Sequence, residues 1–191
     1  MLMNRLLPFA LLLLPGLAHA NPASGPAQGF LCGFQHPLVG LDHLLAMVAV
    51  GLWAAQLGGR AVWAVPASFV GVMTLGGLLG MAAWTLPLVE TGILLSVLLL
   101  GILITFSVRV SAWMGAALVG VFALFHGHAH GTEVPVNVSG WLYVGGFLAA
   151  TAVLHAAGIG CGLAMKNFRF APALRVAGGC VLLGGVLLAL G

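Results

Sequence analysis

The chain has 191 residues, of which six are Lys or Arg, three are Asp or Glu, and 62% are hydrophobic. Soluble domains carry about a quarter charged residues to cover their water-facing surface, so this composition and a mean hydropathy of +1.19 exclude a soluble domain. A membrane-spanning helix takes about 20 residues, which leaves room for about six or seven spans and for no soluble catalytic domain. Three Cys without paired spacing indicate neither a disulfide framework nor a zinc ribbon. We therefore expect an all-α integral membrane protein.

Residues 1–20 have the pattern of a cleavable signal peptide. Arg5 precedes an apolar run that ends at Pro15-Gly16, and Ala18-His19-Ala20 supplies the small residues found before a cleavage site. A retained first transmembrane helix is the weaker interpretation, because the apolar run has only about ten residues. The expected mature transmembrane domain covers residues 21–191.

Six apolar runs follow, each close to the length that crosses the hydrocarbon core of a bilayer. They cover residues 37–57, 61–85, 88–107, 112–130, 140–164 and 173–190. Residues 21–35 are mixed in character and too polar to span, so we expect an external segment there. The prediction is a bundle of six transmembrane helices.

Basic residues predict the orientation of this bundle, because Lys and Arg concentrate in cytoplasmic loops. The loops after spans one, three and five hold every basic side chain of the mature chain: Arg60, Arg109, Lys166, Arg169 and Arg175. The other side holds the three acidic residues near helix ends: Asp42, Glu90 and Glu133. We expect the mature N-terminus and the C-terminus on this second side, in the periplasm of a bacterium, and the protein in the inner membrane.

Small residues four positions apart predict close packing of the spans, because they let helix backbones approach each other. They occur as Gly76-x-x-x-Gly80, Ala116-x-x-x-Gly120, Gly146-x-x-x-Ala150 and Gly158-x-x-x-Gly162. We expect structural packing at nearly all of these positions.

The first span opens with polar residues, in the order His36-Pro37-Leu38-Val39-Gly40-Leu41-Asp42-His43. Pro37 suits the first turn of a helix, so we expect His36 at the helix mouth with Asp42 and His43 about two turns inside. His36 and His43 would share nearly the same helix face, so an ion could contact both. Asp42 would be a further ligand or an acceptor that fixes the tautomer of His43. The alternative, an Asp–His pair that only joins helices, is weaker because ionisable groups inside a span are costly and usually functional.

The fourth span ends Phe125-His126-Gly127-His128-Ala129-His130-Gly131-Thr132-Glu133. If the helix continues, His126, His130 and Glu133 have i, i+4, i+7 spacing and share one face, whereas His128 points elsewhere. Three imidazoles and a carboxylate in so short a stretch are a metal-binding composition, with a solvated His-rich loop as the alternative, above all for His128. Glu90, near the outer end of span three, brings another carboxylate to this level, although alone it would be an interfacial charge.

Four further residues have simpler interpretations. His155 lies well inside span five toward its cytoplasmic side, and a hydrogen bond to a neighbouring carbonyl would account for it. Met47, Met73 and Met81 are expected to fill the core rather than to act as soft metal ligands.

The two His-rich motifs resemble the signature motifs of the HupE/UreJ family of nickel permeases. These motifs are His36-Pro37-x-x-Gly40-x-Asp42-His43 and Phe125-His126-Gly127-x-Ala129-His130-Gly131-x-Glu133. The similarity extends to the size, the signal peptide and the six-span plan. It implies that residues 21–191 form a six-helix permease domain that takes up nickel for hydrogenase or urease maturation. It also implies a functional set of His36, Asp42, His43, His130 and Glu133. From the residues themselves we add His126 and Glu90 as candidate metal ligands. Pro66-x-x-Phe69-x-x-x-Met73 in span two is also similar to this family, without an assigned role.

Ligand chemistry alone leaves the metal open, since imidazole and carboxylate suit nickel, copper, zinc and cobalt. The low Met and Cys content near the motifs argues against a dedicated copper(I) site. The alternatives are a transporter of cobalt or zinc, a nickel sensor or efflux protein, and a haem-binding membrane electron carrier. Haem ligation would use histidine pairs that face each other at one depth, without acidic neighbours.

The sequence contains no Gly-rich phosphate-binding loop, no H-E-x-x-H and no G-x-S-x-G motif, so we expect neither ATP hydrolysis nor protease activity. The expected protein is a transporter and no enzyme, with nickel as a transported substrate and no permanently bound cofactor. Its expected partners are the nickel ion and the lipid bilayer, with no nucleic acid and no evident ATPase subunit. A homo-oligomer, and proton coupling through Asp42 or His155, stay open.

Overall fold

The computed structural model describes residues 26–167 and 171–191, and every secondary-structure element in this part of the chain is an α-helix. The helices are α2 (Pro26–Val39), α3 (Leu41–Leu57), α4 (Ala61–Met81), α5 (Val89–Thr105), α6 (Ala112–Thr132), α7 (Gly140–Asn167) and α8 (Ala171–Leu190). The predicted all-α fold is confirmed for these residues. The expected signal peptide, residues 1–20, and Arg169 lie outside the described residues.

Four helices, α4, α6, α7 and α8, are long and apolar enough to cross a membrane. The pair α2 and α3 passes the same test only as a span bent by 83°, and α5 is apolar but shorter, at 17 residues. Four or five candidate spans fit a multi-pass membrane protein. The count of six spans and the periplasmic location of the two termini stay predictions.

The predicted beginning of the first span is wrong. In place of one helix over residues 37–57, the chain forms α2 as far as Val39, bends, and continues as α3 from Leu41. Pro37 lies inside α2 rather than in the first turn of a helix. Gly40 has extended backbone, with φ −75° and ψ 113°. A helix is weak where proline lacks an N–H and glycine has low helix propensity, and here the two residues fall within one turn.

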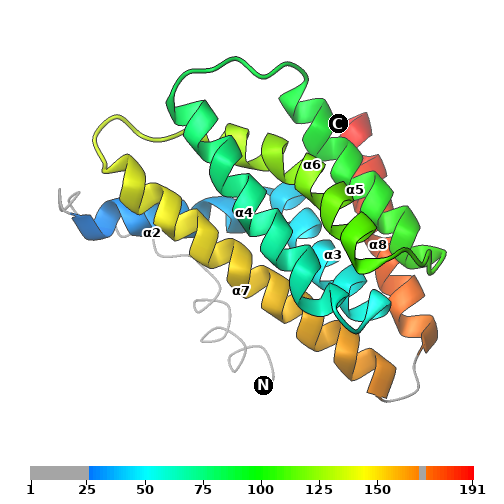
Figure 1. Ribbon diagram of the computed structural model, residues 1–191. Coiled ribbons are helices and arrows are strands. Elements are labelled where there is room, and N and C mark those ends of the chain that lie inside the picture. Colours follow the sequence, from blue (N-terminus) through cyan, green and yellow to red (C-terminus); the bar gives the residue numbers. More distant parts are fainter. Residues whose placement is uncertain (1–25, 168–170) are drawn as a thin grey trace, which may run out of the picture.

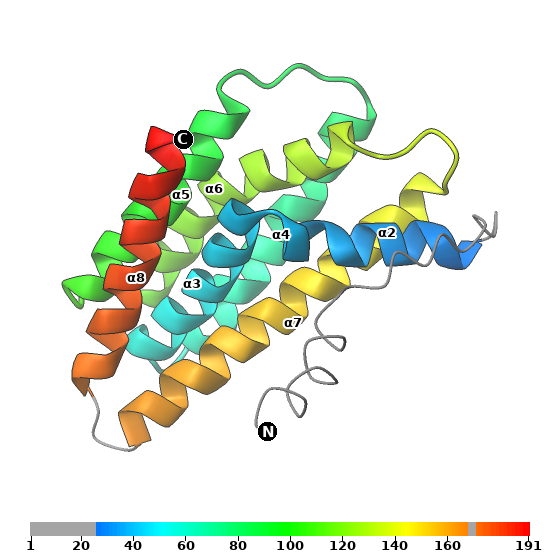
Figure 2. The ribbon, with the colours of Figure 1, turned by 180° about the vertical axis from the view of Figure 1, so that it is seen from behind.

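The helix α2 also includes most of the segment that we expected outside the bundle. It lies across the bundle beside the first half of α7 (Figures 1 and 2). The two backbones touch, because a methyl group on Gly33 would overlap the Tyr143 carbonyl and one on Gly146 would overlap the Phe30 carbonyl. Tertiary packing, rather than intrinsic helix propensity, accounts for most helix stability in proteins.

Glycines bring α4 and α6 side by side along their length. A methyl group on Gly127 or Gly131 would overlap the backbone of α4, and one on Gly76 or Gly80 would overlap the backbone of α6. The predicted packing role of Gly76-x-x-x-Gly80 is therefore confirmed. The contact fixes how α6 is rotated, and so which way its histidines point.

Basic side chains gather at one end of the bundle, which we call the basic end: Arg60, Arg109, Lys166 and Arg175. Lys166 donates to the Ala55 carbonyl at 3.0 Å, and Arg175 donates to the Thr105 carbonyl at 2.9 Å. Cations are favourable there because the carbonyls of helix C-termini carry partial negative charge. The opposite end, where α6 ends and α5 begins, is the histidine end, and the C-terminus lies on its side of the bundle (Figure 1).

Candidate metal centre

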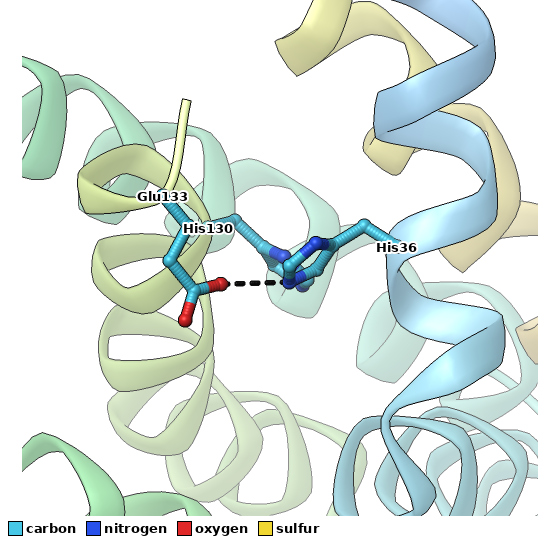
Figure 3. A group of neighbouring side chains, drawn as sticks. All are labelled: His36, His130 and Glu133. Atoms are coloured by element: carbon cyan, nitrogen blue, oxygen red, sulfur yellow. Dashed lines mark ion pairs between the residues drawn. The ribbon is translucent and has the colours of Figure 1, made fainter. Parts of the chain in front are cut away.

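Three side chains that could hold a metal ion meet at the histidine end: His36, His130 and Glu133 (Figure 3). His36 Nε2 lies 2.7 Å from Glu133 Oε2. One ligand atom from each of the three lies within 4.8 Å of the other two. The side chains of Glu133 and His36 are 52% and 33% exposed, whereas His130 is fully buried. The group therefore leads from the surface into the bundle.

The helix α6 continues through Thr132, and Glu133 follows it as the C-cap residue. The i, i+4, i+7 arrangement of His126, His130 and Glu133 thus forms as predicted, with both histidines fully buried. His128 points elsewhere, as expected, but it does not lie in a solvated loop. It is buried, and its Nε2 lies 2.7 Å from the Trp84 carbonyl oxygen.

Asp42 orients His43 in the first turn of α3. Asp42 Oδ1 accepts a hydrogen bond from the His43 backbone N–H at 2.7 Å and lies 2.9 Å from His43 Nδ1. An ionised carboxylate can only accept, so His43 Nδ1 is the protonated nitrogen. The lone pair then lies on Nε2, which is buried and has no hydrogen-bond partner among the described residues. Of the two roles that the sequence left open for Asp42, the acceptor role is the one that this geometry matches.

Four imidazoles form a continuous row, which we call the histidine row: His36, His130, His43 and His126. Ring centroids lie 4.8 Å apart for His36 and His130, 4.5 Å for His130 and His43, and 4.8 Å for His43 and His126. The expected reason for the proximity of His36 and His43 was a shared face of one helix, and this is wrong. The bend at Gly40 places them on two helices with centroids 6.3 Å apart, and α6 supplies His130 between them.

Ser96 of α5 fixes the tautomer of the innermost imidazole in this row. Its hydroxyl donates to the Ile93 carbonyl at 2.6 Å and lies 2.9 Å from His126 Nε2. A hydroxyl has one proton, so His126 Nε2–H must donate to Ser96 Oγ. The His126 lone pair then lies on Nδ1, which is buried and unpartnered within the described chain. Nothing in the sequence pattern around Ser96 indicated this role.

Aromatic side chains of α7 pack against two imidazoles of the histidine row. Tyr143 lies against His36 with centroids 5.9 Å apart, and Phe147 stacks on His130 with centroids 4.7 Å apart and planes 17° apart. Tyr143, Phe147, Thr151 and His155 follow one another at i+4 spacing, so they form one stripe of α7. That spacing is visible in the sequence and is the signal that could have indicated the stripe.

The sequence of this chain is similar to the sequences of known proteins. The chain matches the family described as HupE / UreJ protein over residues 9–188. The chain belongs to the HupE/UreJ family. It is 50% identical over 186 residues to Protein HupE of Rhizobium leguminosarum bv. viciae, with 95% of each chain covered. No solved structure matches it.

Glu90 does not join the histidine row in this HupE/UreJ chain. It is exposed in the first turn of α5 and makes no ion pair or side-chain hydrogen bond within residues 26–167 and 171–191. The metal-ligand group that contains Glu133 does not include it. Its part in metal binding stays a prediction.

The surroundings of His155 contradict the interpretation that its ring donates a hydrogen bond to a neighbouring carbonyl. It is 2% exposed, and neither ring nitrogen has a hydrogen-bond partner in the described part of the chain. Its ring contacts Phe69, whose own ring also contacts His126. Met47 and Met73 belong to the buried core and Met81 packs against it, as expected.

Charge at the mouth of the row favours a cation. The hydrogen bond with His36 holds the pKa of Glu133 below its usual value, so this carboxylate stays ionised at neutral pH. Glu133 and Asp42 together supply two carboxylates beside the imidazole nitrogens of His36 and His43. Nitrogen and oxygen ligands of this kind suit a divalent cation of borderline softness.

Proposed function

We propose that this HupE/UreJ protein takes up nickel ion across the bacterial inner membrane, as a facilitator or secondary transporter that supplies hydrogenase or urease maturation. One observation carries the proposal: an unbroken row of imidazoles leads from the half-exposed Glu133 and His36 to the fully buried His126. A single closed metal site does not need imidazoles at several successive depths in the bundle. A row of similar donors lets an ion exchange one set of ligands for the next.

Nickel is assigned from the family and not from the ligands, because imidazole and carboxylate ligands also suit cobalt and zinc. HupE/UreJ proteins are accessory membrane proteins in nickel handling by hydrogenase and urease. The haem alternative fits the geometry poorly. A porphyrin plane has no space between imidazoles whose centroids lie 4.5 Å apart.

The membrane potential can drive this uptake without ATP. A divalent cation that enters a negative interior gains about 4.6 kcal/mol per 100 mV, twice the figure for a single charge. This free energy corresponds to an accumulation of more than about a thousandfold. A facilitator is therefore sufficient, and proton coupling is the alternative within the same proposal.

Accumulation of radiolabelled nickel by whole cells tests the proposal. A strain that lacks its own nickel uptake should accumulate more nickel when it expresses this chain, and unlabelled cobalt or zinc in excess measures the selectivity. Lower accumulation than in the empty strain would indicate efflux, and equal accumulation would contradict transport of nickel. A haem protein would instead show a Soret absorption band after purification.

A further inference from the structure

The α7 stripe continues beyond the histidine row to His155. Both ring nitrogens of His155 are buried without a partner among the described residues. Buried polar groups nearly always have hydrogen-bond partners, and each exception needs a physical reason. Inside a membrane span the need is stronger, because ionisable residues there are costly and usually functional.

The ring of Phe69, on α4, contacts both His155 and the innermost imidazole of the row. Its ring centroid is 5.1 Å from that of His155, edge to face at 87°, and 5.6 Å from that of His126. Phe69 is fully buried. The Phe69 ring therefore links the inner end of the row to the imidazole of His155 through direct contacts.

Two further side chains that could bind a metal lie one helical turn from Phe69 and His155 on the same helices. Met73 follows Phe69 on α4, and Thr151 precedes His155 on α7. The Thr151 hydroxyl lies 3.9 Å from Met73 Sδ, and both residues are fully buried. A hydroxyl oxygen and a thioether sulfur are acceptors, so they add ligand capacity beside an imidazole.

The core is closely packed on the inner side of His155. A methyl group on Gly51 of α3 would overlap the His155 carbonyl, and one on Gly158 would overlap the Val48 carbonyl. Nearer the basic end, Trp53 and Val65 are fully buried and meet at Gly115 of α6. A cation at His155 would therefore be enclosed, with the Phe69 ring beside it and packed helices on its inner side.

We propose that His155 is an inner binding site for the transported cation, reached from His126 past the ring of Phe69. The site takes a divalent cation of borderline softness, held by a His155 nitrogen with Thr151 and Met73 at its side. This inference rests on the proposed nickel transport and adds a second location for the ion. The Phe69 ring borders both locations.

The test compares His155→Leu with the wild-type chain in right-side-out membrane vesicles at fixed membrane potential. The initial rate of radiolabelled nickel uptake at saturating nickel should fall at least about tenfold, as expected when a ligand on the path is lost. Equilibrium binding of nickel to the purified protein should lose the inner site, while the affinity of the outer row stays unchanged. The matched control is His128→Leu, which removes a buried histidine away from the row and should leave uptake near the wild-type rate.

A second variant guards against a loss that comes from packing alone. His155→Cys keeps a metal ligand in a smaller side chain, and a sulfur ligand favours softer ions. It should transport more nickel than His155→Leu and should be inhibited by Cd²⁺ at lower concentration than the wild type. His155→Phe, which keeps a ring against Phe69 without a ligand, should be as inactive as His155→Leu.

Wild-type uptake by His155→Leu or His155→Phe would overturn the inner site and leave nickel transport intact. Loss of nickel binding to the outer row in His155→Leu would also overturn it, because His155 would then support the fold. Wild-type vesicles that accumulate no nickel would contradict the proposed function itself. The three results are distinguishable in one set of membranes.

Discussion

A single hydroxyl decides which nitrogen of His126 faces the histidine row. Because Ser96 donates its only proton to the Ile93 carbonyl, it can only accept from His126. The lone pair on Nδ1 is therefore held ready for a metal without any charge nearby on α5. Such outer partners orient a ligand and are nearly as important as the ligand itself.

Ser96→Ala should weaken nickel affinity, because His126 is then free to carry its proton on either nitrogen. We expect the KM of nickel uptake to rise about 10- to 100-fold, the usual effect of removing the partner of a metal-binding histidine. Ser96→Thr, which keeps the hydroxyl, should restore most of the affinity. A maximal rate that falls without a change in KM would mean that Ser96 supports packing only.

The histidines of α6 give a comparison within one helix. His130→Ala and Glu133→Ala should reduce nickel uptake strongly, since both side chains belong to the outer group of ligands with His36. His128→Ala should reduce it little, because His128 contacts the Trp84 carbonyl instead. The losses from His130→Ala and His36→Ala should be strongly non-additive in whole-cell uptake, as for residues that share one ion. Normal transport by His130→Ala with an inactive His128→Ala would contradict this assignment.

The candidate ligands were predictable from the sequence, because histidine and carboxylate side chains inside apolar runs are costly and usually functional. His36, His43, His130 and Glu133 were all named from their motifs. Ser96 was not predictable, since its role depends on a contact between α5 and α6 that no local spacing encodes. The exposed position of Glu90 has the same origin, because rotation of α5 is set by packing and not by its sequence alone.

At the scale of helices, α4 and α6 approach each other so closely that the contact requires small residues. Gly127→Ala should destabilise the protein, because the added methyl group would overlap the Met73 carbonyl and force the helices apart. We expect a loss of about 1–3 kcal/mol, as for overpacking in a tight core. The midpoint of thermal unfolding in detergent measures it. Gly71→Ala on α4 meets nothing within 4 Å and is the matched control, with equal or higher stability expected.

Hydropathy predicted the existence of the apolar helices, and the observed bounds of α4 to α8 lie within a few residues of the predicted runs. It could not predict α2, whose mixed, glycine-containing sequence packs closely on α7 at Gly33. The bend at Gly40 was missed for a related reason. Pro37 favours the first turn of a helix and weakens the later turns of one, so only the packing of α2 on α7 accounts for its place inside α2.

At the scale of the whole molecule, external pH should control uptake through the imidazoles. A neutral imidazole is needed to bind a metal, and protons compete for the same lone pair. Initial nickel uptake into vesicles at subsaturating nickel should therefore fall as external pH is lowered from about 7 to about 5.5, the range in which histidine titrates.

Titration of Glu133 does not contribute to the pH dependence of uptake in this range. Its pKa is held below the usual value by the hydrogen bond with His36, so it stays ionised across this range and loses its charge only at lower pH. A decline between neutral and mildly acidic pH thus reports the histidines. A rate that rises steadily on acidification, at fixed membrane potential, would show instead that proton symport governs uptake.

The glycine contacts also divide the bundle into blocks. Backbone contacts join α2 and α3 to α7 through Gly33, Gly146, Gly51 and Gly158, and they join α4 to α6, whereas α6 touches α3 and α7 only sparsely. His36, His43 and His155 belong to the first block, and His126, His130 and Phe69 belong to the second. Contacts between the two blocks, mainly those of α4 with α3 and α7, are fewer than the contacts within each block, so relative rocking is least hindered there. A small tilt along it would change the His36–His130, His43–His126 and Phe69–His155 separations together, so one rigid-body movement could release an ion at the mouth and open its way inward.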